Sequence, residues 1–143
     1  MSCVNCHCDQ QCCFDYCDWD YLKGICNTCQ ISVAIVPNAV LKQGAPLTRQ
    51  PDGRYTWFDP QATPPQRFAG ILMRNWQTDE NGNGIFRTCW PNCNHIEVGM
   101  YISGVFRISD MDITTDQLNA IVAQGRGFIH GDPNTQSGLL QLF

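Results

Sequence analysis

Residues 96–108, which read IEVGMYISGVFRI, carry the clearest strand signal in the chain. The apolar residues that recur there with a period of two are Ile96, Val98, Met100 and Ile102, and Phe106 and Ile108 keep the same parity past Gly104. Residues spaced by two lie on one face of a strand. The pattern therefore predicts a long strand with these residues on its buried face. The residues between them, Glu97, Tyr101 and Ser103, are expected on the solvent or interface face.

Shorter strands separated by turns are predicted on either side of this segment. The β-branched run 31–36 places Ile31, Val33 and Ile35 on one face. Residues 54–58 (RYTWF) and 68–73 (FAGILM) also read as strands. The Pro-Asp-Gly sequence before the first of them and the Asn-Gly sequences of residues 79–84 are turn signals.

One helix is well marked. Residues 114–125 (TTDQLNAIVAQG) offer Thr114 as the N-cap, Gln117 three residues on, and Gly125 as the stop. The expected buried stripe of this helix is Leu118, Ile121 and Val122. The apolar C-terminal stretch 137–143 is expected to dock on the domain. The fold class predicted from the residues is mainly β with one short helix.

Composition argues for an assembly protein. Charged residues make up 15% of the 143 residues, against about 25% in a typical soluble domain, and a surface short of charge usually lies against a partner. The nine Lys and Arg are scattered and the net charge is −4, which disfavours nucleic-acid binding. The apolar runs are too short to span a membrane. No secretory signal is recognisable, so synthesis in a cytoplasm is expected.

The cysteines divide the chain into two regions. Eight of ten fall between Cys3 and Cys29, which predicts a cysteine-rich N-terminal arm over residues 1–30 and a β-rich domain over residues 31–143. An arm with so few aliphatic residues needs a cross-link to be ordered. The disulfide candidates are Cys3, Cys6, Cys8, Cys12, Cys13, Cys17, Cys26, Cys29, Cys89 and Cys93. The alternative is zinc, for which the two C-x-x-C pairs supply Cys3, Cys6, Cys26 and Cys29. Free thiols are a third possibility.

Two further motifs have ordinary structural explanations. Residues 79–84 (DENGNG) match the first half of a calcium loop, but Trp90 stands where the bidentate Glu is needed, so a turn is expected. His130 lies two residues from Asp132, but no nucleophile with an activating context accompanies them. We therefore expect no enzymatic activity.

An ordered series of residues resembles the head decoration (capsid cement) proteins of lambda-like tailed bacteriophages. The segments are residues 40–60 (VLKQGAPLTRQPDGRYTWFDP), 67–73, 98–111 and 114–125. The matching positions are Leu41, Gly44, Leu47, Asp52, Gly53, Tyr55, Asp59, Pro60, Ala69, Gly70, Ile71, Leu72, Gly104 and Phe106. The arm departs from the family, where it is typically rich in Ser, Thr and Pro.

The resemblance implies a small decoration domain of β-clip or pseudobarrel type that forms a homotrimer. It implies binding to the major capsid protein on the outer surface of an expanded phage capsid, so that the protein belongs to the virion. No cofactor and no nucleic-acid or membrane partner is implied, and the cysteine-stapled arm would serve as a clasp. The alternative function is a protein-binding adaptor that carries a zinc ribbon in residues 1–30.

Overall fold

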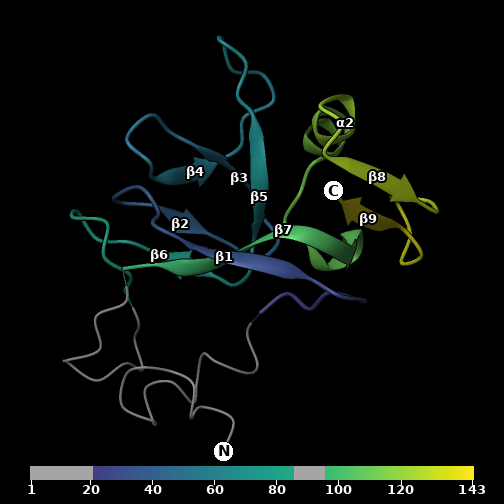
Figure 1. The fold of residues 1–143 in the computed structure, drawn as a ribbon, viewed down its shortest axis with the longest axis horizontal. Helices are drawn as coiled ribbons and strands as arrows, with labels where there is room; N and C mark the ends of the chain where they lie inside the picture. Colours follow the sequence, from purple (N-terminus) through teal and green to yellow (C-terminus); the bar gives the residue numbers. More distant parts are fainter. Residues whose placement is uncertain (1–20, 86–95) are drawn as a thin grey trace, which may run out of the picture.

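The structure, a computed structural model, describes residues 21–85 and 96–143 (Figure 1). These residues form a mainly β domain with one short α-helix, which confirms the predicted fold class. The strands are β1 (Cys29–Val33), β2 (Val40–Leu41), β3 (Pro46–Arg49), β4 (Tyr55–Trp57), β5 (Phe68–Leu72), β6 (Trp76–Gln77), β7 (Val98–Arg107), β8 (Gly127–His130) and β9 (Leu139–Leu142). The helices are the 3-10 turn η2 (Ile108–Asp110) and α2 (Thr115–Ala123). Within the described ranges, no helix has the length and apolar character needed to cross a membrane.

The long strand β7 organises the main sheet, whose order is β4-β3-β5-β7-β9-β8 with β1 also paired to β7. The first half of β7 pairs antiparallel with β1 and with β5. Its second half, from Gly104 to Arg107, pairs with β9. In Figure 1, β1 runs alongside β7, and the β8–β9 hairpin lies with α2 at the other end of the molecule. The C-terminal stretch is therefore docked in the sheet, as predicted.

The sheet curls into a half-barrel. The chain after β1 returns to the far edge of the sheet, where Ile35 forms a parallel bridge with Tyr55 of β4. Two backbone hydrogen bonds hold this contact: the Tyr55 N–H donates to Ala34 O at 2.8 Å, and the Val36 N–H donates to Tyr55 O at 3.0 Å. The bridge closes one end of the half-barrel. The other end, beside Ile31, stays open, and Ile31 is accordingly exposed whereas Val33 and Ile35 are buried.

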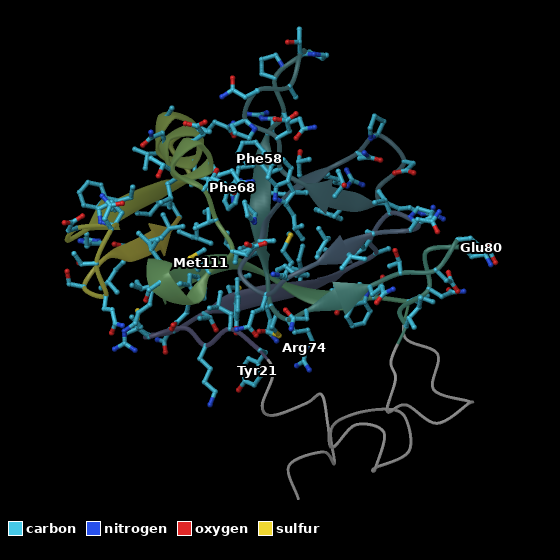
Figure 2. The ribbon with its side chains drawn as sticks, turned by 180° about the vertical axis from the view of Figure 1, so that it is seen from behind. Tyr21, Phe58, Phe68, Arg74, Glu80 and Met111 are labelled. Carbon is cyan, nitrogen blue, oxygen red and sulfur yellow. The ribbon has the colours of Figure 1, made fainter. Side chains whose placement is uncertain are left out.

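Two hydrophobic clusters lie on opposite faces of β7. One cluster fills the half-barrel and consists of Val33, Ile35, Ala45, Leu47, Leu72, Trp76, Val98 and Met100. The other lies beneath α2 and the β8–β9 hairpin and consists of Leu22, Phe58, Phe68, Ile71, Met73, Tyr101, Phe106, Ile108, Leu118, Ile121, Leu140 and Leu142. Figure 2 shows Phe58 and Phe68 together beside the helix, and their ring centroids are 6.0 Å apart. Adjacent residues of one strand thus supply two separate cores.

The predicted faces of residues 96–108 are wrong in three respects. Ile96, which was expected on the buried face, lies before β7 and is 54% exposed. Tyr101 is buried, although it was expected on the exposed face. Phe106 does not keep the parity of Met100 but joins the cluster of Tyr101, with the two ring centroids 4.8 Å apart. Tyr101 does lie opposite Met100, but the cluster beneath the helix covers that face as well. The change of parity at Phe106 comes from a bulge: Cys29 pairs with Ser103 and Gln30 with Tyr101, so Ile102 is an extra residue on β7. Gly104, at φ +135°, lies just past the bulge, where its backbone lets the strand change direction.

The helix forms as the sequence predicts, with one error. Thr114 and Gln117 make a capping box, in which the Gln117 N–H donates to Thr114 Oγ1 at 3.1 Å and the Thr114 N–H donates to Gln117 Oε1 at 2.9 Å. Gly125 follows the helix at φ +72°. Val122 is 39% exposed and was wrongly placed in the buried stripe. Its place is taken by Gln117, which is fully buried and donates from Nε2 to Phe58 O at 2.8 Å.

Residues 21–29, which the sequence analysis assigned to the arm, pack on the strands of the second region. Tyr21 forms an antiparallel bridge with Arg74, and Figure 2 shows the two side chains together. Leu22 is buried in the cluster beneath the helix, and its N–H donates to Met73 O at 2.6 Å. The phenol of Tyr101 donates to Leu22 O. This segment is therefore part of the same packed unit as the sheet.

Candidate functional site

The structure describes two of the ten cysteines. Cys26 and Cys29 are exposed, and within the described residues neither forms a disulfide. The other candidates, Cys3, Cys6, Cys8, Cys12, Cys13, Cys17, Cys89 and Cys93, lie outside the described residues. Within residues 21–85 and 96–143 no three His, Cys, Asp or Glu side chains gather as metal ligands. The disulfide and zinc hypotheses for the arm therefore both stay predictions.

The half-motif of a calcium loop is a turn, as expected. The carboxylate Oδ1 of Asp79 accepts hydrogen bonds from the backbone N–H groups of Asn81 at 2.8 Å and Asn83 at 2.9 Å. These backbone donors hold the pKa of Asp79 below its ordinary value, and the N–H of Asn83 has the largest effect. The carboxylate oxygen is thus used to close the turn between β6 and Ile85.

His130 and Asp132 serve the β8–β9 hairpin through separate partners. The Nε2 atom of His130 lies 2.8 Å from Oε1 of Gln141, and its ring meets that of Phe128 edge to face. Asp132 accepts a hydrogen bond from the Asn134 N–H at 2.9 Å in the connecting turn. Both contacts are structural and lie within the hairpin.

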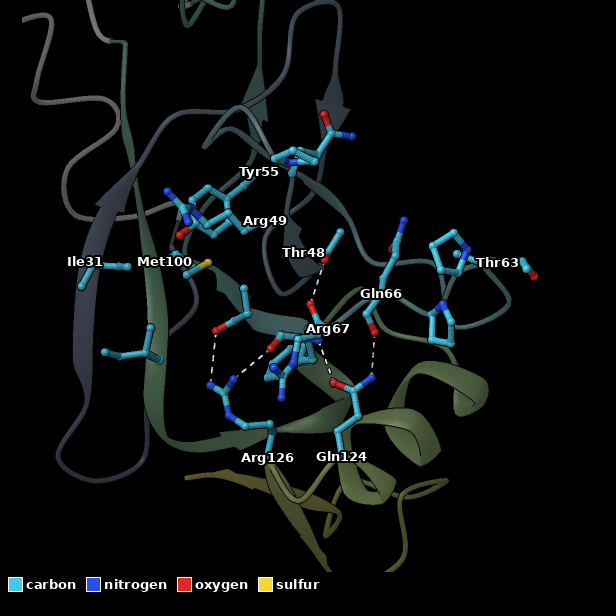
Figure 3. Close-up of a pocket in the computed structure, with 18 residues that line it drawn as sticks. Ile31, Thr48, Arg49, Tyr55, Thr63, Gln66, Arg67, Met100, Gln124 and Arg126 are labelled. Atoms are coloured by element: carbon cyan, nitrogen blue, oxygen red, sulfur yellow. Dashed lines mark hydrogen bonds between the residues drawn. The ribbon is translucent and has the colours of Figure 1, made fainter.

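A groove of about 1210 Å³ lies at the open end of the half-barrel (Figure 3). Ile31 of β1 and Ile102 of β7 form one wall. The opposite wall comes from the end of β3, from Tyr55 and from the loop before β5. The residues on that wall are Thr48, Arg49, Gln50, Pro51, Tyr55, Ala62, Thr63, Pro64, Pro65, Gln66 and Arg67. Phe68, Ala69 and Met100 line the groove, and the end of α2 adds Gln124 and Arg126.

Two residues that follow α2 hold β5 in place beside this groove. The guanidinium of Arg126 donates to Phe68 O at 2.8 Å and to Ala69 O at 3.3 Å, and it lies 5.4 Å from the Phe68 ring centroid. Gln124 accepts from the Phe68 N–H at 2.8 Å and donates to Gln66 O at 3.0 Å. These contacts satisfy the backbone where β5 shifts register against β3. Figure 3 shows the four hydrogen bonds as dashed lines.

The lining of the groove is better suited to binding an elongated ligand than to catalysing a reaction. Its walls combine branched aliphatic, aromatic and proline side chains with three arginines at positions 49, 67 and 126. Such a lining can bury apolar side chains and pair with carboxylates, since guanidinium groups bind carboxylates through two parallel hydrogen bonds. We therefore take the groove as a candidate binding site for an acidic, apolar peptide segment.

Sequence reasoning missed this site because its residues come from five separate parts of the chain. Pro64, Pro65 and the arginine that follows them are visible in the sequence as a short local pattern. Nothing in the sequence shows that they lie close to Ile31 or Ile102. The bulge in β7 and the curl of the sheet bring them together.

A smaller hollow of about 860 Å³ lies on the other face of β7. It is lined by Tyr21, Lys23, Gly24, Ile25, Cys26, Asn27, Thr28, Gln30, Met73, Arg74 and Tyr101. Burial raises the pKa of the Tyr101 phenol to about 12. The O–H of this phenol donates a hydrogen bond to Leu22 O, so Tyr101 has a structural role here.

Comparison with known proteins identifies no relative: no protein-family model, no curated protein sequence and no solved structure matches this chain.

Proposed function

We propose that this protein is a structural virion protein that binds the outer surface of an expanded phage capsid as a homotrimer. It cements neighbouring subunits of the major capsid protein. The proposal combines the residue series that resembles capsid decoration proteins with an exposed aromatic edge of the sheet.

The residues of that series occupy a consistent part of the fold. Leu47 lies in β3, Gly53 takes φ +90° in the following turn, and Tyr55 opens β4. The next segment of the series, Ala69 to Leu72, lies in β5 and pairs with β3. The chain therefore forms the strand–turn–strand and short third strand that the resemblance implies, which supports the proposal.

The main structural support for the proposal is the edge strand β8. It is the last strand of the main sheet, and its outward face continues across β9. Phe128 on this face is 52% exposed and Phe143, just past β9, is 59% exposed. Sheet edges invite pairing with another chain, and natural proteins usually protect them with charge or cover. An aromatic edge is therefore expected to be covered in an assembly.

A cement protein needs no chemistry beyond binding. A trimer that binds the expanded shell in preference to other states stabilises that shell by its binding free energy. Three linked copies that contact several capsid subunits convert weak individual contacts into tight attachment.

Native mass spectrometry and sedimentation of the full chain test the trimer. We expect three copies of the 16.1 kDa chain, and we expect Phe128→Ser to shift the equilibrium towards monomer. Val122→Ser is the matched control, because Val122 is also exposed but lies on the helix. It should leave the trimer intact.

Binding to expanded shells of the major capsid protein tests the role itself. We expect the full chain to cosediment with expanded shells and to raise their melting temperature, with little binding to unexpanded shells. If the arm is a disulfide clasp, a strong reductant should lower that gain in melting temperature. A chain that stays monomeric at high concentration and fails to bind expanded shells contradicts the proposal.

A further inference from the structure

The groove at the open end of the half-barrel has a one-sided charge. Arg49, Arg67 and Arg126 line it, and none of its described lining residues is Asp or Glu. Arg126 is already engaged with the carbonyls of Phe68 and Ala69. Arg49 and Arg67 are exposed residues on the wall opposite Ile31, where a carboxylate can reach them (Figure 3). The charge therefore favours an acidic occupant.

The matching charge is found at the start of the same chain. Residues 1–20 contain four aspartates, Asp9, Asp15, Asp18 and Asp20, and neither Lys nor Arg. After residue 20 the nine remaining acidic residues and the nine basic residues cancel, so this segment carries the whole net charge of −4. Within it, residues 14–20 (FDYCDWD) interleave three aspartates with three aromatic residues.

We propose that the groove receives residues 14–20 of a second copy of this chain. The aspartates pair with Arg49 and Arg67, and the aromatic side chains pack on the apolar walls formed by Tyr55, Pro64 and Ile102. The inference deepens the proposed function, on which it rests for self-association: it assigns the groove as the receptor through which copies of the chain hold one another.

A second copy is favoured over the chain's own arm by the position of Tyr21. Tyr21 packs on the cluster beneath the helix, on the face of β7 that carries Tyr101. The groove is on the other face, which carries Met100. Residues 14–20 precede Tyr21 directly, so the segment starts on the wrong side of the sheet to enter its own groove. The groove of a neighbouring copy has no such restriction.

A peptide of residues 13–21 with both cysteines replaced by serine tests the site directly. It is labelled with a fluorophore and titrated with the full chain carrying Asp15→Lys and Asp18→Lys, so that the chain's own arms do not compete. We expect saturable binding that weakens with added salt. Arg49→Glu with Arg67→Glu should weaken it at least tenfold. Lys42→Glu with Arg107→Glu makes the same change in net charge at exposed residues outside the groove and should change it less than twofold.

Charge exchange in the full chain tests whether assembly uses the same contact. Arg49→Glu with Arg67→Glu should reduce the trimer fraction in native mass spectra, and so should Asp15→Arg with Asp18→Arg. A chain that carries all four substitutions should recover it. Circular dichroism and the urea midpoint of each variant check that the domain remains folded.

The outcomes separate this inference from the proposed function. A trimer that binds shells while the peptide fails to bind, or binds equally to the groove variant and its control, overturns the inference and leaves the proposed function intact. Failure of the fourfold variant to recover the trimer also counts against it. A monomer that ignores expanded shells but binds the peptide through Arg49 and Arg67 overturns the proposed function and keeps the groove as a receptor for this acidic sequence.

Discussion

The phenol of Tyr101 donates a 2.6 Å hydrogen bond to the carbonyl of Leu22, a residue 79 positions earlier in the chain. Both residues are buried in the cluster beneath the helix. The bond anchors the segment before β1 to the middle of β7. It also explains why a tyrosine occupies a core position: its ring packs with Phe106 while its hydroxyl satisfies a buried carbonyl.

Tyr101→Phe should destabilise the fold by about 1–3 kcal/mol, because the Leu22 carbonyl would stay buried without its donor. Urea unfolding followed by tryptophan fluorescence measures the change. Tyr55→Phe is the control, since the Tyr55 side chain is only half-buried at the groove. Equal stability of Tyr101→Phe and the parent protein would mean that the bond contributes nothing.

Stability should also fall at high pH through the same phenol. Burial raises the pKa of Tyr101 to about 12 in the folded protein, against about 10 in an unfolded chain. The protonated phenol therefore contributes fully to the free energy of unfolding below pH 10, and this contribution is lost as the pH rises from 10 towards 12. Urea midpoints between pH 9 and pH 11.5 should fall more steeply for the parent than for Tyr101→Phe. Parallel curves for the two proteins would contradict the shift.

Gly104→Ala should be much more damaging than Gly125→Ala. Both glycines have positive φ, which costs an alanine about 1–2 kcal/mol. A Cβ at Gly125 would meet no atom within 4 Å, whereas a Cβ at Gly104 would lie 2.8 Å from Thr28 Cγ2 and 2.9 Å from Phe106 Cζ. Overpacking of this kind adds about 1–3 kcal/mol. Thermal unfolding of both variants measures the difference, and similar losses would show that the site beside Phe106 relaxes freely.

Thr114→Ala should cost about 1 kcal/mol, because the N–H of Gln117 would lose the acceptor that caps the helix. Thr115→Ala is a closely matched control: Thr115 is the next residue, equally exposed, and makes no capping bond. It should change the free energy of unfolding by less than about 0.5 kcal/mol. The difference in free energy of unfolding between Thr114→Ala and Thr115→Ala, measured by chemical unfolding, gives the contribution of the cap. Equal losses in the two variants would show that the cap contributes nothing.

Local signals in the sequence predicted the helix and the strands β1, β4, β5 and β7, but not β2, β3, β6, β8 or β9. The helix was predicted with its N-cap and its stop, because a capping box and a terminal glycine act within a few residues. β5 and the turn at Gly53 followed from short-range patterns for the same reason. Val122 was misplaced because periodicity does not reveal how wide the covered stripe is. Gln117 was missed as a core residue because its partner, Phe58, is distant in sequence.

The arrangement of faces and the groove could not be predicted from the sequence. Strict alternation along β7 fails at the bulge, where Ile102 is an extra residue, and no residue type announces a bulge at that position. The bulge changes the face of Phe106, whereas Tyr101 lies opposite Met100 as alternation predicts and is buried because the cluster beneath the helix covers that face too. The groove depends on this bulge and on the bridge between Ile35 and Tyr55, both of which arise only when distant segments meet.

The central position of β7 also fixes the order in which the chain can fold during synthesis. β3, β4 and β5 are consecutive and can pair as soon as they emerge from the ribosome. β1 is made before them, yet among the described strands it pairs with β7 alone, and β9 is made last of all. β1 therefore stays without its partner until Ser103 has been synthesised. Such long-range pairing slows folding and exposes strand edges to other chains, so expression at a slower rate or lower temperature should raise the yield of native protein.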